Sequence, residues 1–308
     1  MPGPTIRFFN RSDAIEIIRI PLLMIASWVV PERHWDIAAG MIARWISRLP
    51  TQHLRVQRQR LRHLYNGRLE AAQMRAIDTD LIVHQHVAWM RGLREYRPGT
   101  RHSDITVAGT EHVDAALANG DGVVLWVTPF VYSHLATKKV MHEAGYRVSH
   151  LSRSSHGFSS SRFGYQFLNP IWTRIEDRYL AERVRLDNDA GPAAALTVLR
   201  QRLRENRIVS ITVTRYARKT AAVAFLNAEL RLPTGPGRLA RATRAPLLPI
   251  FAVRTDSGGL EVTIGSPLGG DGADGGGDPV MAIMQNYVKQ LEPYALRYPS
   301  QWGRELGP

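Results

Sequence analysis

The segment GVVLWVT, residues Gly122–Thr128, places five consecutive apolar side chains between a glycine and a threonine. A continuous apolar run of this length is typical of a central strand in a parallel sheet, because such a strand is buried on both faces. The residues that follow, Tyr132–Ala144, show a helical pattern that Gly145 ends. A second strand is predicted at Tyr146–Leu151. This strand–helix–strand order indicates parallel strands in one sheet.

The same alternation continues on both sides of this unit. Upstream, Ile105–Ala108 is predicted to be a strand and His112–Ala118 a short helix. The elements predicted downstream are helices at 162–182, 192–205 and 236–243, strands at 208–214 and 247–253, an edge strand at 261–264, and a loop at 269–278 before a last helix. The sequence therefore predicts an α/β fold with a mostly parallel central sheet flanked by helices.

The first hundred residues have a different pattern. Apolar residues recur at helical spacing at Ile15, Ile18, Leu22, Ile25 and Val29. The apolar run is too short and too interrupted to span a bilayer, and no secretory signal is recognisable. An amphipathic helix is predicted here. Two interpretations stay open for its apolar stripe, which either packs on the protein's own core or lies in a membrane surface.

The chain is strongly basic and lacks cysteine. Its 308 residues carry 40 Lys and Arg against 27 Asp and Glu, a net charge of +13, and twelve arginines fall within residues 44–101. Such a balance favours an anionic partner, either an anionic membrane surface or a nucleic acid. No nucleic-acid-binding motif is present, so we expect no specific nucleic acid. The absence of cysteine excludes disulfides, iron–sulfur clusters and thiol nucleophiles.

Several motifs occur in an order that resembles a known family. They are VAGTEHVDAALANGDGVVLWVT at 107–128, Phe225-Leu226-Asn227, LPTGPGRLARATRAPLLPIFAVR at 232–254, and YPSQW at 298–302. Together they resemble the bacterial late acyltransferases of lipid A biosynthesis (lauroyl and myristoyl transferases), within the lysophospholipid acyltransferase-like superfamily. The resemblance covers roughly residues 105–302.

The resemblance implies a lysophospholipid acyltransferase-like α/β fold. It also implies peripheral attachment to the cytoplasmic face of the inner membrane of a bacterium, and acyl transfer from an acyl carrier protein or acyl-CoA to a hydroxyl or amine. The thioester is a co-substrate, and we expect no cofactor and no metal. We divide the chain into a helical, membrane-associating segment at 1–104 and an acyltransferase-like body at 105–308, forming one structural domain overall.

One motif departs from the family pattern. The family places a catalytic His-x-x-x-x-Asp/Glu directly after the first central strand, and here Pro129 stands at the histidine and His134 at the carboxylate. Proline accepts no proton, so three readings remain open. His134 acts as the base, with help from Tyr132, Ser133 or a distant carboxylate. Otherwise the base lies in the His-rich segment 149–156, or the fold binds a lipid or acyl carrier protein without turnover.

Further residues are candidates for holding the donor. Arg153 and Arg162 stand among serines and glycines whose backbone amides could approach a phosphate, and Arg215 replaces a family acidic position. Thr234 and Gly235 form the turn of the 232–254 motif.

Two other patterns are assigned structural roles. Ion pairs within one helix are predicted for Arg174 with Asp177 and for Arg178 with Glu182. The pattern His84-x-His86 is interpreted as packing rather than as a metal site.

Overall fold

The computed structural model describes residues 7–47, 59, 61–99, 105–187, 191–213, 217, 219–269 and 278–301. The N-terminal helices are α1 (Arg11–Val29), the short 3-10 helix η1 (Glu32–His34), α2 (Trp35–Ser47) and α4 (Ala71–Arg94). The first half of the body contains β1 (Ile105–Ala108), α5 (Thr110–Ala118), β2 (Val123–Val127), α6 (Ser133–Glu143), β3 (Val148–Ser152), the π-helical turn η2 (Gly164–Leu168), α7 (Asn169–Asp177) and β4 (Glu182–Arg185). The second half contains α8 (Gly191–Arg204), β5 (Ile208–Thr212), β6 (Thr220–Phe225), β7 (Ala228–Pro233), α9 (Gly235–Thr243), β8 (Leu247–Arg254), β9 (Leu260–Ile264), α10 (Pro279–Arg297) and η4 (Pro299–Gln301).

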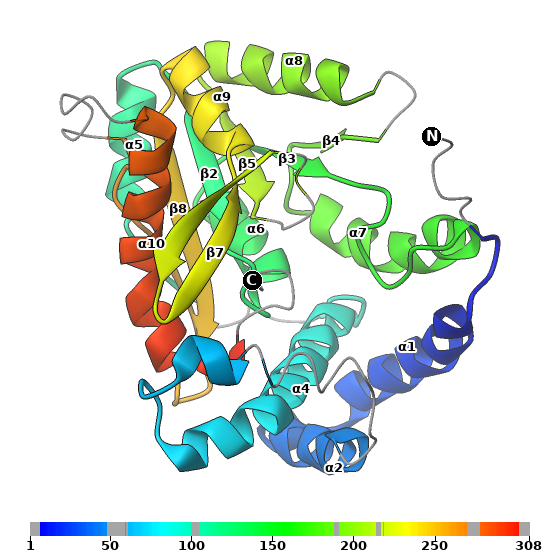
Figure 1. Cartoon of the computed structure of the whole chain (residues 1–308). Coiled ribbons are helices and arrows are strands. Elements are labelled where there is room, and N and C mark those ends of the chain that lie inside the picture. The colour runs from blue at the N-terminus through cyan, green and yellow to red at the C-terminus, as the bar shows by residue number, and fades with distance from the viewer. Residues whose placement is uncertain are drawn as a thin grey trace.

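Seven strands form the central sheet in the order β1-β9-β8-β2-β5-β3-β4. All neighbouring pairs are parallel except β8 with β9. The strand predicted from GVVLWVT is β2, which lies in the middle of the sheet with all five residues buried. The α/β prediction is therefore confirmed, with a mainly parallel sheet covered by helices (Figure 1).

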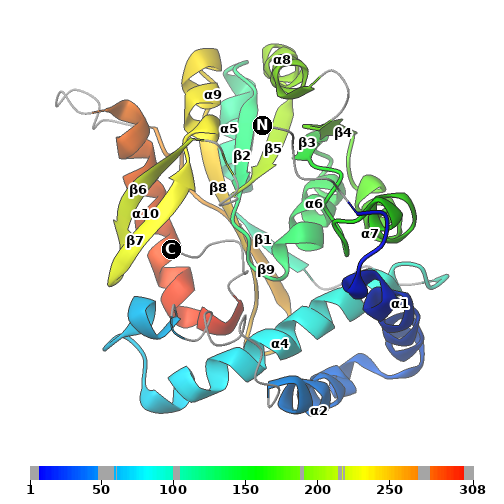
Figure 2. The same ribbon diagram turned by 45° about the vertical axis from the view of Figure 1, so that its right-hand side comes forward.

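Successive side chains of β2 point to opposite faces of the sheet and pack into two separate hydrophobic cores. Val124 and Trp126 pack with α8, α9 and α10 on one face, whereas Val123, Leu125 and Val127 pack with α4, α5 and α6 on the other. Helix α4 crosses below the sheet, at the end where β2 and β8 finish (Figure 2). The carboxyl ends of the strands are therefore faced by the N-terminal helices.

Two predictions about the body were wrong, and one element was missed. The strand β9 is not at the edge of the sheet, because β1 pairs outside it. The helix predicted over 162–182 ends at Asp177, and Glu182 begins β4 instead. The hairpin β6–β7 forms a separate two-stranded sheet that was not predicted.

The predicted ion pairs within one helix were also wrong. Asp177 binds Arg183, with Nε 2.6 Å from Oδ1, because the chain turns back into β4 after α7. Glu182 lies in β4 and binds Arg202 of α8, with Nε 2.7 Å from Oε2. Both carboxylates thus join different elements rather than successive turns of one helix.

Helix α1 presents its predicted apolar stripe outwards. Ile15, Ile18, Leu22, Ile25 and Val29 are 60%, 64%, 60%, 61% and 75% exposed. The opposite face, which packs against the protein, contains the residues Asp13, Glu16, Ile20, Leu23 and Ser27. The stripe therefore does not pack on the protein's own core. Among the described residues, no helix combines the length and apolarity that crossing a membrane requires.

Candidate active site

The loop that carries the candidate catalytic residues is fixed by backbone hydrogen bonds. Thr128 donates its N–H to Ile250 of β8 at 3.0 Å, and Val131 donates its N–H to the carbonyl oxygen of Gln301 at 2.8 Å. Helix α6 then begins at Ser133. The loop after β2 is therefore held at the carboxyl edge of the sheet, where open α/β folds bind their ligands.

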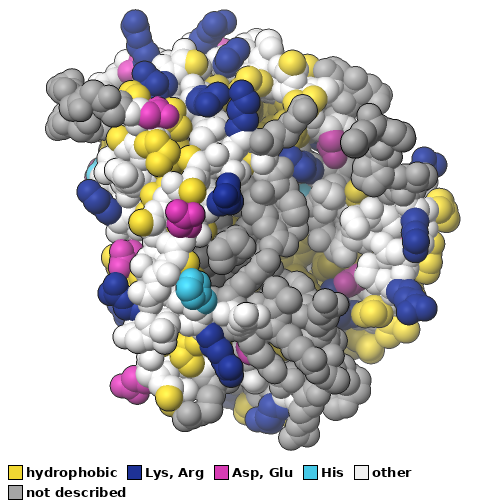
Figure 3. All heavy atoms as spheres, viewed as in Figure 1, with side chains coloured by type: hydrophobic (Ala, Val, Ile, Leu, Met, Phe, Trp, Pro, Cys, Tyr) yellow, Lys and Arg dark blue, Asp and Glu magenta, His cyan; other side chains and the backbone are white. Residues whose placement is uncertain are grey.

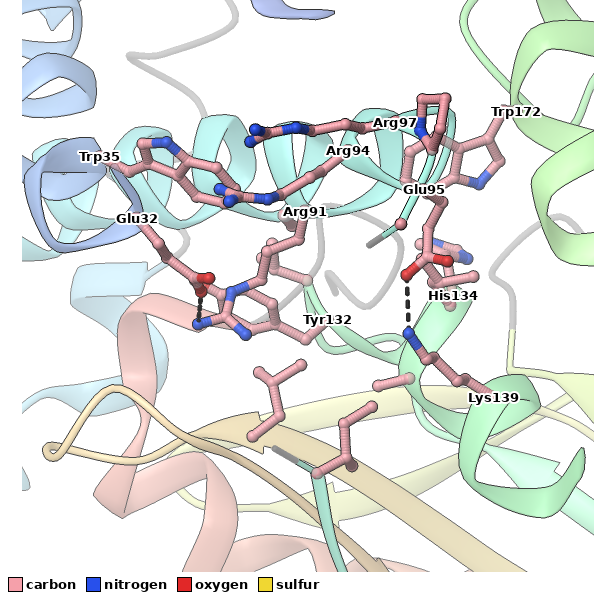
Figure 4. Close-up of a pocket in the computed structure, with 18 residues that line it drawn as sticks. Glu32, Trp35, Arg91, Arg94, Glu95, Arg97, Tyr132, His134, Lys139 and Trp172 are labelled. Atoms are coloured by element: carbon pink, nitrogen blue, oxygen red, sulfur yellow. Dashed lines mark hydrogen bonds and ion pairs between the residues drawn. The ribbon is translucent and has the colours of Figure 1, made fainter. Parts of the chain in front are cut away.

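His134 lines a pocket of about 490 Å³ between the end of α4 and the start of α6 (Figure 4). Glu32 and Trp35 form another part of its wall, and Trp172 of α7 closes it near His134. Pro129 precedes this loop and supplies no side-chain base. Of the two positions of the degenerate motif, His134 is the one that reaches the pocket.

A histidine–carboxylate pair lies directly behind His134. The rings of His134 and His156 are 5.4 Å apart between centroids. The Nε2 atom of His156 lies 2.9 and 3.0 Å from the two carboxylate oxygens of Glu176. Glu176 is fully buried at the end of α7. The structure thus brings together one residue from α6, one from the His-rich segment and one from α7.

Glu176 is also the centre of a buried charge cluster. Its carboxylate accepts from Lys138 Nζ at 3.2 Å, Arg183 Nη2 at 2.8 Å and Trp172 Nε1 at 3.0 Å. Burial alone would raise the pKa of Glu176, but His156, Lys138 and Arg183 hold it well below its usual value. Glu176 is therefore an anion at neutral pH.

The same surroundings keep His134 uncharged. Burial lowers the pKa of His134 to about 3, and His156 and Lys138 reinforce this effect. One nitrogen or oxygen atom from each of His134, His156 and Glu176 lies within 4.8 Å of the others, a spacing that a metal ion could use. However, Lys138 and Arg183 already neutralise Glu176, and their charge opposes a further cation. The cluster therefore fits a histidine–carboxylate pair better than a metal site.

The other two candidates near His134 are buried. The hydroxyl of Tyr132 lies 2.9 Å from Nδ1 of His84, and burial raises the pKa of Tyr132. The pKa of His84 is lowered to about 4, mainly by burial. The Ser133 hydroxyl is buried and has no hydrogen-bond partner. Tyr132 reaches the pocket wall, whereas Ser133 faces the interior.

The candidate donor-binding residues that the structure describes lie outside the wall of this pocket. Arg153 is exposed on the loop after β3, and Arg162 is exposed before η2. The nearby backbone amide of Ser154 is bound by the chain's own Asp187, at 2.9 and 3.0 Å from its carboxylate oxygens. Arg215 lies outside the described residues.

The turn of the 232–254 motif leads into α9. Thr234 is buried, and its N–H donates to Lys219 O at 3.2 Å. Gly235 is exposed at the first position of α9, with open space where a side chain would project.

Sequence reasoning missed the pairing of His156 with Glu176. The His-rich segment 149–156 includes His156, but Glu176 was not singled out as a candidate. The two residues are 20 positions apart and no spacing rule connects them. The interpretation of His84-x-His86 as packing agrees with the structure, where His84 bonds Tyr132 and His86 Nδ1 bonds the Ile82 carbonyl at 2.8 Å.

Comparisons with known proteins identify the family of this chain. The family described as bacterial lipid A biosynthesis acyltransferase matches residues 22–303. A phosphatidylinositol mannoside acyltransferase of Mycobacterium tuberculosis strain H37Rv is 30% identical over 155 residues, covering 50% of this chain and 46% of the relative. The corresponding protein of strain CDC 1551 matches to the same extent. The chain thus spans about half the length of these curated relatives. With nearly its whole length matched, the chain belongs to the family of bacterial lipid A biosynthesis acyltransferases.

Proposed function

We propose that this protein transfers an acyl group from a thioester of acyl carrier protein or CoA to a hydroxyl or amine of a lipid or small-molecule acceptor. The observation that carries this proposal is the position of His134. It lines a pocket at the carboxyl end of β2 and has the His156–Glu176 pair directly behind it. Neutral imidazole in such a place can accept a proton as an acceptor oxygen or nitrogen attacks.

The proposed reaction follows the order of a general-base acyl transfer. His134 takes the proton of the acceptor hydroxyl while the oxygen forms a bond to the thioester carbonyl carbon. The tetrahedral intermediate then expels the thiolate, which takes the proton back from the imidazolium and leaves as a thiol. Glu176 stabilises the transient positive charge across His156. Tyr132 and Ser133 are buried beside His134, so we assign them positioning roles.

The donor is proposed to approach from the loops around the sheet edge. Arg153, Arg162 and Arg215 supply positive charge that suits the phosphates of CoA or the acidic surface of an acyl carrier protein. Thr234 and Gly235 lie at the start of α9, where an open space faces Gly235. This assignment rests on the sequence motifs and, for Arg153, Arg162 and Gly235, on their exposure.

The protein is also proposed to lie on the cytoplasmic face of a bacterial membrane. Besides the five residues of the α1 stripe, the exposed apolar residues of the N-terminal helices include Trp28, Ile37, Met41 and Ile42. We call these nine residues the outer face. Arg7, Arg11, Arg33 and Arg44 are exposed in the same segment. In Figure 3, hydrophobic and basic side chains gather together at the right edge, where Figure 1 shows α1. This mixture suits an anionic lipid surface.

A second function is favoured by the low pKa of His134. A base whose pKa is about 3 accepts protons poorly, and Pro129 removes the family's usual base. The alternative is therefore a protein that binds a lipid or acyl carrier protein on the same scaffold without turnover.

A turnover assay separates the two functions. The full chain is incubated with acyl-CoA or acyl carrier protein thioester and with acceptor lipids, including lipid A precursors and phosphatidylinositol mannosides, and thiol release is measured. We expect the wild type to release thiol, His134→Ala to lose at least about 100-fold in rate, and His63→Ala, which changes an exposed histidine, to match the wild type. Donor binding without thiol release supports the alternative. Full activity in His134→Ala contradicts the assigned base.

A further inference from the structure

Helices α8 and α9 pack side by side and carry basic side chains that no described residue neutralises. Neither helix contains an aspartate or glutamate. The arginines on or directly after them that are exposed, and whose side chains form no ion pair or hydrogen bond with any described residue, are Arg200, Arg204, Arg238, Arg241 and Arg244. We call these five residues the α8–α9 surface.

Arginines next to this surface do have partners within the chain. Arg202 Nε lies 2.7 Å from Glu182 Oε2, and Arg207 Nε lies 3.3 Å from Glu205 Oε2. The carboxylates that follow or adjoin α8 are therefore already bound by residues outside the α8–α9 surface. Within the part of the chain that the structure describes, the charge of the surface is left for an external anion.

The helix dipole accounts for only part of this arrangement. A cation in the last turn of a helix is stabilised by the partial negative charge there, which applies to Arg204 and Arg241. Arg200 lies one turn before the end of α8, and Arg238 lies in the first half of α9. Arg244 has a φ of 60°, a conformation that glycine usually takes after a helix. The dipole therefore leaves Arg200 and Arg238 unexplained.

The α8–α9 surface lies at the opposite edge of the sheet from the N-terminal helices. Helices α8 and α9 lead into the first residues of β5 and β8, so their C-terminal ends lie at the amino edge of the sheet. Helix α4 crosses at the carboxyl edge (Figure 2). In Figure 3, basic side chains gather at the top, where Figure 1 shows α8 and α9. A flat bilayer against the outer face therefore does not reach this surface.

The chemistry of the surface favours an acidic protein helix as its partner. Arginines three or four residues apart on each helix are about 5–6 Å apart at Cβ, and glutamates on a facing helix repeat at the same interval. Arginine binds carboxylates in a bidentate manner. Leu196, one turn before Arg200, is 37% exposed and offers an apolar contact beside the charges. Neither helix contains an aromatic residue on which the bases of a single-stranded nucleic acid would stack.

We propose that the α8–α9 surface binds an acidic helix of a soluble protein. This goes beyond acyl transfer, because the pocket lined by His134 lies at the other edge of the sheet. The bound protein lies on the side of the molecule that faces away from the outer face. The chain can then rest on a bilayer and hold a soluble acidic partner beside that bilayer at the same time.

The test measures the binding of an acidic helix to the full chain. The probe is a fluorescein-labelled, alanine-based peptide that carries one leucine and glutamates at intervals of four residues. Its fluorescence anisotropy is followed at about 0.1 M salt. The double variant Arg200→Glu, Arg204→Glu should weaken binding at least about 10-fold, because it replaces attraction between opposite charges by repulsion. The double variant Arg238→Glu, Arg241→Glu should do the same from α9.

Matched variants separate this surface from the general charge of the chain. The double variant Arg7→Glu, Arg33→Glu makes the same change in charge at exposed arginines of the N-terminal segment. It should alter peptide binding by less than about 2-fold, because salt screens charges more than about 10 Å apart. The urea midpoints of the α8 and α9 variants should equal that of the wild type, since the replaced side chains are exposed. Peptide affinity should be unchanged when the chain is bound to phosphatidylglycerol vesicles.

Four results would overturn the proposal: no peptide binding by the wild type, an equal loss in the N-terminal control, a loss confined to the variant of one helix, or loss of the peptide on vesicles. A single-stranded RNA oligonucleotide serves as a competing probe. If the wild type binds it more tightly than the peptide, and the α8 and α9 variants weaken that binding, the surface is a nucleic-acid site instead.

Discussion

The outer face of the N-terminal helices and the cluster around Glu176 depart from ordinary protein structure in opposite ways. The outer face exposes large apolar side chains to water. The cluster removes a carboxylate, a lysine and an arginine from water and pairs them with one another. Each arrangement is unfavourable by itself. The free-energy cost of burying the charges in the cluster is offset by ion pairs inside the fold. The cost of exposing apolar side chains on the outer face is offset only when another surface covers them. Changes in the cluster should therefore alter stability, and changes in the outer face should alter binding.

The largest expected effect is on stability, from Glu176→Gln. This change leaves Lys138 and Arg183 buried without their shared anion, so we expect the free energy of unfolding to fall by about 3–5 kcal/mol. Urea denaturation followed by circular dichroism measures it. The control is Glu205→Gln, whose carboxylate pairs with Arg202 at the surface and whose loss should leave the midpoint close to that of the wild type. Equal urea denaturation midpoints for Glu176→Gln and Glu205→Gln would contradict the role of the Glu176 cluster in stability.

The next effect is on membrane binding, from the double variant Leu22→Asp, Ile25→Asp. Both side chains are exposed, so the free energy of unfolding should hardly change. Binding to anionic vesicles should weaken on the order of 100-fold, because burying a leucine or isoleucine contributes about 1.5–3 kcal/mol. Co-sedimentation measures this change. Leu196→Asp, at an exposed leucine of α8, is the matched control. If that control loses binding equally, the outer face is not the contact.

A smaller effect concerns pH. His84 and His134 have pKa values lowered to about 4 and about 3, so between those values and about 6.5 the unfolded chain binds more protons than the folded one. Stability should therefore fall as the pH falls below 6.5, by up to about 1.4 kcal/mol per pH unit for each histidine. Denaturation midpoints at pH 7, 6 and 5 test this. His134→Gln should reduce the slope, and a stability that rises on acidification would contradict the assignment.

The smallest effect separates charge from apolar contact at the membrane. Raising the salt concentration from 0.1 to 0.5 M screens the exposed arginines but not the apolar side chains. We expect binding to anionic vesicles to weaken only several-fold in the wild type. Binding that vanishes in salt would indicate attachment by charge alone.

The parts of the fold that could be predicted are those whose signal is local. The continuous apolar run 123–127 marks a strand buried on both faces, and β2 is such a strand. Strand β4 gives no such signal, because Glu182, Arg183 and Arg185 supply three of its four residues. Those charges are tolerated because Arg183 binds Glu176 and Glu182 binds Arg202. The pattern of the sequence cannot show partners that arrive from α7 and α8.

In the candidate site, too, only the residues with a local sequence signal could be predicted. The motif after β2 pointed to His134, and the structure places it in a pocket. The pairing of His156 with Glu176 depends on the turn of the chain between β3 and α7, and the pocket wall opposite His134 depends on α4 crossing below the sheet. The stripe of α1 was correctly identified as apolar, but only the packing of Asp13 and Glu16 inwards shows which way it faces.

Gln301 has a consequence for the time at which the site forms. Its side-chain amide accepts from Arg254 N and donates to Arg254 O, both at 2.7 Å, and its backbone oxygen holds Val131. The loop that carries His134 is thus secured by a residue 170 positions later. During synthesis the N-terminal helices emerge first. The residues of the outer face therefore leave the ribosome well before Gln301 can secure the loop that carries His134.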